Sequence, residues 1–180
     1  MKVFITGRPR IGKTTALLRI YEGLKSKGVN VGGMITLELR EGGVRKGFKI
    51  IDLSGEREGI LALKGSGKGP SLGSYSVHVD ELEEIGVGAI RRALRDCEVV
   101  IIDEIGPMEL FSKSFKSIII KAILGPKPMI ASVHRRIINA TWFRSLQERV
   151  QAKMITLTLT NRCSVPTVVV EEVMRCLRTR

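Results

Sequence analysis

A glycine-rich segment near the start of the chain constrains the fold more than any other feature. It matches the pattern GxxxxGK[ST] at every fixed position, and its members are Gly7, Arg8, Pro9, Arg10, Ile11, Gly12, Lys13 and Thr14. A short apolar run at 3–6 precedes it, and residues 15–27 carry apolar side chains at helical spacing. The order strand, loop, helix directs main-chain N–H groups and a helix N-terminus at polyphosphate oxygens. The segment therefore predicts a phosphate-binding loop.

Each residue type in this loop has a predicted task. Gly7 and Gly12 let the backbone turn and approach a ligand closely. The Lys13 ammonium is predicted to reach the β- and γ-phosphates, and the Thr14 hydroxyl to bind magnesium. Arg10 stands where many such loops have glycine, so a positive φ there would strain the backbone modestly. A solvated Arg10 side chain is favoured over a phosphate contact.

The length and composition are those of one domain. A chain of 180 residues can bury its own core, so residues 1–180 are predicted to form a single domain. No apolar stretch approaches the ~20 residues that span a bilayer, and no signal-peptide pattern is seen, so a cytoplasmic location is expected. Three cysteines without paired spacing predict buried free thiols rather than a zinc or disulfide framework; they are Cys97, Cys163 and Cys176.

The net charge of +12 is unevenly distributed along the chain. Residues 1–50 hold 11 basic and 3 acidic groups, residues 51–112 hold 6 and 12, and residues 113–180 hold 13 and 3. Such a balance permits contact with RNA or DNA, but a basic face also speeds the encounter with polyphosphate substrates. No basic run with interleaved aromatic residues is present, so nucleic acid is not the favoured partner.

Apolar periodicity predicts an α/β fold. Turn signals and β-prone runs indicate a β-hairpin over 29–53, followed by an irregular or short-stranded excursion over 54–74. Asp80 and Glu83 have the spacing of a helix-capping signature, so a helix is predicted from Asp80. Further strands are expected at 75–79, 99–102, 128–133 and 154–159, and further helices at 112–124, 137–150 and 166–177. This alternation predicts a three-layer, mostly parallel, doubly wound sheet with an antiparallel hairpin extension.

Two carboxylates follow the most apolar strand. Asp103 and Glu104 end the run at 99–102, and in open α/β sheets the carboxyl ends of the strands meet at one ligand site. A carboxylate beside a phosphate loop is the expected second magnesium anchor, so Asp103 is predicted to bind the metal through water. Glu104 is predicted to be the general base for an attacking water. The alternative for Glu104 is a structural pair with a neighbouring arginine.

Other candidate side chains follow later strands. His134 is predicted either to contact the γ-phosphate or to be a structural histidine, and His78 is assigned no role. Asn161 and Arg162 follow a late strand, where nucleotide-binding proteins often grip the base. The guanine signature NKxD is absent because no Asp follows at the required place.

Several strings together resemble one family over nearly the full length. They are the phosphate loop, Thr36 to Arg40, Arg45 to Phe48, Gly73 to Tyr75, Asp103 to Leu110, and Asn161-Arg162. The chain resembles the THEP-type nucleoside-triphosphatases, archaeal and bacterial P-loop proteins with a cancer-related human relative. The resemblance implies a magnesium-dependent hydrolase of several nucleoside triphosphates on a RecA-like sheet. It adds Thr15 and Gly106 to the predicted nucleotide-binding residues.

The chain departs from this family at three positions. The family commonly has glycine at Arg10, lysine at Pro107 and aspartate at Cys163. Any role of that lysine or aspartate is therefore not transferred. Glu38 and Arg40 match a family motif without a role that follows from the residues.

The leading hypothesis is hydrolysis of a nucleoside triphosphate to the diphosphate and phosphate with Mg²⁺, by a monomer. ATP, GTP, CTP, UTP and TTP are all expected substrates, because the loop and the metal read no base. Slow turnover is expected, because no arginine is securely placed as a finger; the candidates are Arg10, Arg135 and Arg162. The alternatives are a small-molecule or nucleoside kinase, with Arg135-Arg136 starting a lid, and a nucleic-acid-binding switch.

Overall fold

The computed structural model describes residues 1–55, 57–65, 67 and 69–179. Within these residues one sheet contains the strands β1 (Lys2–Gly7), β2 (Val31–Glu41), β3 (Val44–Asp52), β4 (Glu58–Lys64), β5 (Ser71–Leu72), β6 (Tyr75–Val77), β7 (Val99–Ile105), β8 (Met129–Val133) and β9 (Lys153–Leu157). The helices are α1 (Lys13–Lys25), α2 (Val79–Glu81), the π-helix η1 (Leu82–Val87), α3 (Gly88–Asp96), the 3-10 helix η2 (Glu109–Phe111), α4 (Lys113–Leu124), α5 (Arg135–Ile138), α6 (Thr141–Arg149) and α7 (Val165–Arg178).

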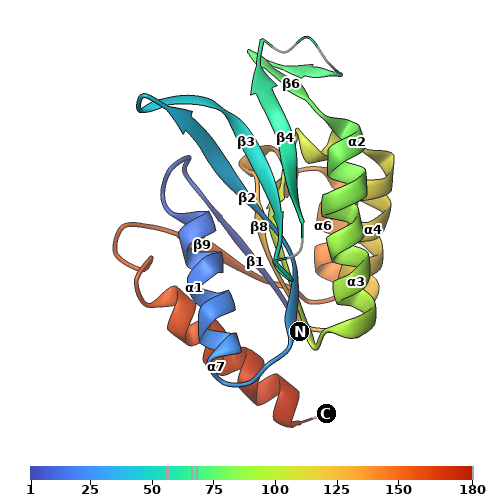
Figure 1. The fold of residues 1–180 in the computed structure, drawn as a ribbon. Helices are drawn as coiled ribbons and strands as arrows, with labels where there is room; N and C mark the ends of the chain where they lie inside the picture. Colours follow the sequence, from blue (N-terminus) through green and yellow to red (C-terminus); the bar gives the residue numbers. More distant parts are fainter. Residues whose placement is uncertain (56, 66, 68, 180) are drawn as a thin grey trace.

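The strand order is β5-β6-β4-β3-β2-β7-β8-β1-β9. From β2 to β9 all neighbours are parallel, whereas β3, β4, β6 and β5 extend the sheet in antiparallel fashion. Helices cover both faces: α1 and α7 lie on one face, and α3, α4 and α6 lie on the other (Figure 1). The predicted α/β class with its antiparallel hairpin is confirmed.

The sheet is mixed rather than mostly parallel, which corrects the prediction. The segment at 54–74 contributes more regular structure than the expected excursion, because the apolar run at 60–63 forms most of β4 and pairs with β3. Its Leu61 and Ala62 are fully buried, so this strand belongs to the core. Residues 56, 66 and 68 of that segment lie outside the described residues.

Two helix predictions are also corrected. The first helix after β6 begins at Val79, and His78 precedes it without a side-chain cap. Glu83 does not complete a capping box because its carboxylate accepts a hydrogen bond of 2.6 Å from Ser112. The helix predicted at 137–150 is two helices, since Ala140 is extended between α5 and α6. This break lets Phe143 pack against Phe4 of β1 with ring centroids 4.9 Å apart.

Each face of the sheet has its own apolar core. On β7, Val100 and Ile102 belong to the core beneath α3, α4 and α6, whereas Val99 and Ile101 belong to the core beneath α1 and α7. Successive strand residues point to opposite faces, so a continuous apolar run is what a strand covered on both faces requires. The site residues that follow this run, Asp103 and Glu104, belong to a strand in which every residue but the half-buried Glu104 is buried.

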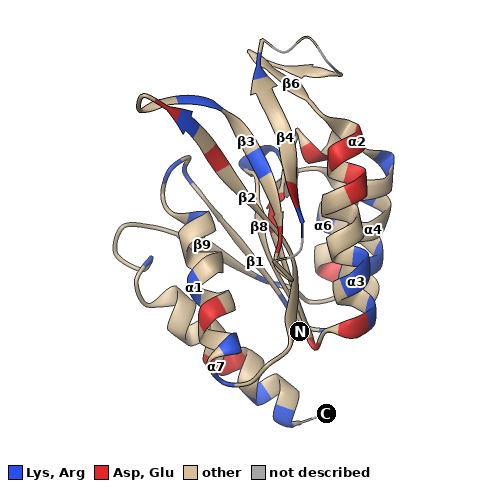
Figure 2. Cartoon of the chain, in the orientation of Figure 1, with Lys and Arg blue, Asp and Glu red and all other residues tan. Residues whose placement is uncertain are grey.

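The charges along the helix from α2 to α3 follow the helix dipole, whereas the exposure of the cysteines differs from the expectation from the sequence. Acidic residues gather near the start of the helix that runs from α2 into α3, and basic residues lie near its end (Figure 2), which complements the helix dipole. The cysteines are free thiols as predicted, but Cys163 is exposed and the other two are half-buried, so the prediction of buried thiols was wrong.

Within the described residues no helix is long and apolar enough to span a bilayer.

The close approach of β2 to β7 gives the first testable prediction. A Cβ atom on Gly33 would lie 1.9 Å from the Ile101 carbonyl oxygen, and φ at Gly33 is +127°. Gly28 also has a positive φ, +77°, but a Cβ atom there would meet nothing within 4 Å. Gly28→Ala should lower the free energy of unfolding by about 1–2 kcal/mol through backbone strain. Gly33→Ala should cost about 3–5 kcal/mol, because a steric clash adds to that strain.

Urea unfolding of both variants measures the difference. Equal losses of stability in Gly33→Ala and Gly28→Ala would contradict the assigned contact between β2 and β7.

Candidate active site

The predicted phosphate loop connects β1 to α1 in the required conformation. Gly7 has φ +152°, and a Cβ atom there would lie 2.8 Å from the Leu157 carbonyl oxygen of β9. Gly12 has φ +105° and immediately precedes α1. The loop therefore needs glycine at both positions, for close approach at the first and for backbone conformation at both.

Arg10 has the positive φ that would strain the backbone of a non-glycine residue. Its φ is +63°, a region that favours glycine, and its side chain is exposed. Arg8, Pro9 and Thr15 are exposed as well, whereas Ile11, Lys13 and Thr14 are half-buried. Positive φ in a non-glycine residue costs roughly 1–3 kcal/mol and persists where the surrounding structure imposes it.

The Asp103 carboxylate joins the loop to two strands. Its Oδ2 accepts a hydrogen bond of 2.6 Å from the Thr14 hydroxyl, and its Oδ1 accepts one from Ser132 on β8. The Asp103 carbonyl oxygen accepts a third, 2.6 Å long, from Thr36 on β2. Burial raises the pKa of Asp103 to about 6, although the hydrogen bonds from Ser132 and Thr14 lower it. The two residues predicted to bind magnesium are thus in direct contact.

Glu104 lies beside the loop lysine. Its Oε1 is 3.5 Å from Lys13 Nζ, an ion-pair distance that is long for a hydrogen bond. This Oε1 is buried without a hydrogen-bond partner among the described side chains and main chain. Burial raises the pKa of Glu104, while the charge of Lys13 lowers it. The cation that pairs with Glu104 is therefore the loop lysine rather than the neighbouring arginine of the alternative interpretation.

Glu109 is a site residue that the sequence analysis did not single out. It is 4% exposed, and burial together with the negative charge of Glu104 raises its pKa to about 8. A Cβ atom on Gly106 would lie 2.7 Å from Glu109 Oε2 and 3.4 Å from Glu104 Oε2. Gly106 thus leaves room for two carboxylates, a task different from direct nucleotide contact. The only sequence signal was the motif string that contains all three residues.

His134 reaches the same edge of the sheet from β8. Its Nδ1 accepts a hydrogen bond of 3.2 Å from the main-chain N–H of Arg136, so it caps the short helix α5. Burial lowers the pKa of His134, and the charges of Lys13, Arg136 and Arg135 lower it further. The cap agrees with the structural interpretation of His134, and contact with the γ-phosphate stays a prediction.

Three other predicted residues have structural partners. The side-chain oxygen of Asn161 accepts a hydrogen bond of 2.8 Å from Thr158 N, and its Nδ2 donates one of 3.0 Å to the Thr156 carbonyl. Arg162 in the same loop is exposed. On the β2–β3 hairpin, Glu38 forms ion pairs with Arg40 and Arg45, so the Glu38–Arg40 motif braces the hairpin.

The oxygen donors fit a metal ion that keeps part of its water. Within the described residues, no group of three or more His, Cys, Asp or Glu side chains could enclose a metal. Thr14 and Asp103 supply one hydroxyl and one carboxylate, which is the pattern of magnesium sites completed by waters and substrate phosphates. The contact between the two side chains marks where such an ion would enter.

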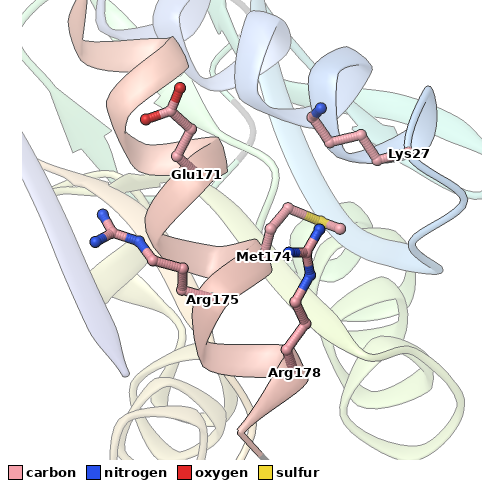
Figure 3. A pocket seen from close by; sticks show the side chains of 5 residues that line it. All are labelled: Lys27, Glu171, Met174, Arg175 and Arg178. Atoms are coloured by element: carbon pink, nitrogen blue, oxygen red, sulfur yellow. The ribbon is translucent and has the colours of Figure 1, made fainter.

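A groove of about 560 Å³ lies away from these residues (Figure 3). It is lined by Lys27, Glu171, Met174, Arg175 and Arg178. α1 has 13 residues and so is about 20 Å long, which separates Lys27 from the phosphate loop. Arg175 and Arg178 occupy the last turn of α7, where basic side chains offset the helix dipole. This groove is not part of the candidate active site.

The arrangement can bind a polyphosphate and activate water. Lys13 and the N-terminus of α1 attract phosphate oxygens, and Glu104 places beside them a carboxylate whose Oε1 lacks a hydrogen-bond donor among the described residues. Asp103 differs because hydroxyl groups already occupy both of its oxygens.

Known proteins share both the sequence and the fold. The NTPase family matches residues 2–170. Nucleoside-triphosphatase THEP1 of Thermofilum pendens is 51% identical over 169 residues, which are 94% of this chain and 93% of that protein. The protein of the same name from Methanocaldococcus jannaschii is 44% identical over 90% of this chain and 91% of its own length.

Two solved structures have a similar fold over nearly the full length of the chain. THEP1 from Aquifex aeolicus has a TM-score of 0.84 and 32% identity, covering 96% of this chain and 99% of its own. A human cancer-related nucleoside triphosphatase has a TM-score of 0.76 and 31% identity, covering 99% and 97%. The predicted resemblance is confirmed. By this match over nearly its full length, the chain belongs to the NTPase family, alongside the THEP1 nucleoside-triphosphatases.

Proposed function

We propose that this protein hydrolyses nucleoside triphosphates to nucleoside diphosphates and phosphate, with Mg²⁺ as its cofactor. The observation that carries the proposal is the half-buried Glu104 side chain beside Lys13, whose buried Oε1 lacks a hydrogen-bond donor among the described residues. Buried polar atoms normally have partners, so this oxygen marks a place for a water molecule. Its relatives carry the name nucleoside-triphosphatase, which agrees with water as the acceptor.

The order of the parallel strands supports a P-loop NTPase sheet of the RecA type. β8 lies between the loop strand β1 and the acidic strand β7. Ser132 of β8 therefore donates a hydrogen bond to Asp103. His134, which directly follows β8, lies close enough to Lys13 for the lysine charge to lower its pKa. In this proposal the nucleotide lies across the carboxyl ends of β7, β8 and β1, where ligands of open α/β sheets bind.

The loop and two carboxylates divide the chemistry. The main-chain N–H groups of the loop at 7–14, which Pro9 lacks, hold the β- and γ-phosphates, and Lys13 neutralises charge that develops on the γ-phosphoryl oxygens. Thr14 and Asp103 would hold the magnesium ion, which supplies further charge neutralisation when bound. Water oxygen bonds to the γ-phosphorus as the bond to the β–γ bridging oxygen breaks. Glu104 takes the proton of the attacking water.

A kinase is the weaker proposal for this site. Kinases with this loop exclude water with a basic lid. Arg135 and Arg136 begin a helix of four residues, and both side chains are exposed rather than folded over the loop. The net charge of +12 is compatible with a nucleic-acid-binding switch, but no specific contact among the described residues favours one.

Slow turnover is expected because the arginines that could act as a finger are exposed. An arginine finger contributes about 10³–10⁵ in rate, and the three candidates Arg10, Arg135 and Arg162 all have exposed side chains. An exposed guanidinium has to be ordered by another group before it can neutralise the transition state.

Lys13→Ala should abolish phosphate release, because it removes the charge that neutralises the γ-phosphoryl oxygens. Folding should change little, since Lys13 is a half-buried residue at the start of α1 and belongs to neither apolar core cluster. The measurement is phosphate release from MgATP, alone and with nucleoside or RNA added as acceptor or partner. Lys25→Ala, at the far end of the same helix, is the control. Parental rates in Lys13→Ala would refute the assignment of the loop.

Glu104→Gln should keep binding of the magnesium nucleotide but lower kcat by about 10²–10⁴, the usual weight of a general base. A base acts in its ionised form, so the parental kcat should fall as the pH drops through the raised pKa of Glu104. The Gln variant should lack that limb of the pH profile. Glu148→Gln, an exposed surface change, is the control. Loss of nucleotide binding instead would make Glu104 a structural or metal-binding residue.

The proposal also includes broad base selectivity. The loop and the metal read no base, and Cys163 cannot supply the carboxylate that guanine selectivity requires. The kcat/KM values for ATP, GTP, CTP, UTP and TTP should therefore agree within about two decades, as imperfect contacts separate substrates by ~1–3 kcal/mol. The five values are to be measured at one magnesium and salt concentration. A preference above roughly 10⁴ would reveal a dedicated base pocket.

A further inference from the structure

The loop between β9 and α7, residues 158–164, presents an apolar side chain to solvent. Leu159 is 71% exposed, more than Val44 at 56%, Val168 at 43%, Leu124 at 42% or Phe111 at 39%. Burying a leucine side chain stabilises by roughly 1.5–3 kcal/mol, so folding gains little from Leu159 where it stands. A ligand that covers the Leu159 side chain would gain the free energy of burial that folding does not use.

The loop that carries Leu159 is held by its own hydrogen bonds. Asn161 uses both ends of its side-chain amide, as acceptor from Thr158 N within the loop at 2.8 Å and as donor to Thr156 O of β9 at 3.0 Å. Main-chain bonds add to this, from Arg162 N to Thr158 O at 3.1 Å and from Val165 N to Asn161 O at 3.0 Å. The Asn161 amide is therefore already oriented by bonds to the chain itself, while Leu159 and Arg162 remain exposed.

The loop lies directly beside the phosphate loop. β9 pairs with β1 in parallel, with Gly7 opposite Leu157, and a Cβ atom on Gly7 would lie 2.8 Å from the Leu157 carbonyl oxygen. Only Thr158 lies between Leu157 and Leu159 in the chain. In Figure 1 the loop projects beside the start of α1.

The strand order sets the direction of a bound nucleotide. Glu104 lies on β7 and Lys13 pairs with it, so the γ-phosphate end points toward β7. β9 lies on the other side of β1 from β7 and β8. The nucleoside end of a triphosphate held by the loop consequently points toward residues 158–164.

We propose that Leu159 is the apolar surface on which the nucleobase packs, and that Asn161 is a positioning residue that holds the loop rather than a residue that reads the base. This inference rests on the proposed function. The ring faces of purines and pyrimidines are alike in being apolar and planar, so a leucine surface accepts every base. The exposed Arg162 guanidinium can stack beside it without selecting a base. The broad selectivity of the enzyme then has a structural cause.

The test compares nucleotides with a ligand that has no base. Leu159→Ala should weaken binding of the β,γ-imido analogues of ATP and GTP by about 5- to 20-fold each, since it removes one apolar contact. Magnesium tripolyphosphate should bind the variant as it binds the parent. Leu124→Ala, a leucine exposed at the end of α4, is the matched control and should change none of the three affinities. Calorimetry gives all three dissociation constants.

Asn161 is tested by the ratio of the two affinities. Asn161→Ala should weaken both analogues by the same factor and leave tripolyphosphate unchanged, because the loop loses its brace. A residue that reads the base would instead change the ratio between the adenine and guanine analogues. Asn161→Asp keeps the acceptor for Thr158 N, so it should restore part of the affinity for both.

The outcomes separate this inference from the proposed function. Parental affinity of Leu159→Ala for both analogues would overturn the inference while leaving hydrolysis untouched. A changed adenine-to-guanine ratio in Asn161→Ala would likewise overturn it. A parental protein that binds neither tripolyphosphate nor the analogues would instead refute the proposed function.

Discussion

The hydrogen bonds of the Asp103 carboxylate hold the site together. Thr14 donates to one oxygen and Ser132 to the other, so the start of α1 and the end of β8 are tied to the end of β7. The main chain of the same residue accepts from Thr36 and ties in β2. A buried carboxylate is costly unless it is hydrogen-bonded, so these contacts favour one arrangement of the four elements. The loop reaches its working position as part of folding.

The carboxylates near this point have different environments and hence different tasks. Both Asp103 oxygens are occupied by hydroxyl groups, and Glu104 faces the ammonium of Lys13 with one oxygen still lacking a donor. Glu109 is buried behind Gly106, and its pKa of about 8 keeps it largely protonated at neutral pH. A second ionised carboxylate beside Glu104 would raise its pKa further, so a neutral Glu109 favours the ionised form of Glu104, which its proposed role as a base requires.

The features that could be predicted from the sequence are those that contiguous residues specify. The features that could not be predicted depend on contacts between distant parts of the chain. The loop at 7–14 and the strand before Asp103 are contiguous, so spacing and hydropathy were sufficient. The strand order arises from long-range pairing, so the four-stranded antiparallel part was underestimated. Glu109 and Leu159 carry no individual signal, because burial of a carboxylate and exposure of a leucine are visible only in three dimensions. Asn161 was predicted to bind nucleotide, which stays a prediction, and its hydrogen bonds to Thr158 and Thr156 were not predictable from composition.

The central claim is that Glu104 meets the attacking water while Thr14 and Asp103 face the metal. The most direct measurement is a crystal structure with magnesium, ADP and aluminium fluoride, which mimics the phosphoryl group in transfer. The account predicts a water in line with the transferred group and within hydrogen-bond distance of Glu104, with the magnesium ion on the Thr14 and Asp103 side. A structure with Glu104 bound directly to magnesium, or with no water between Glu104 and the fluoride group, would contradict it.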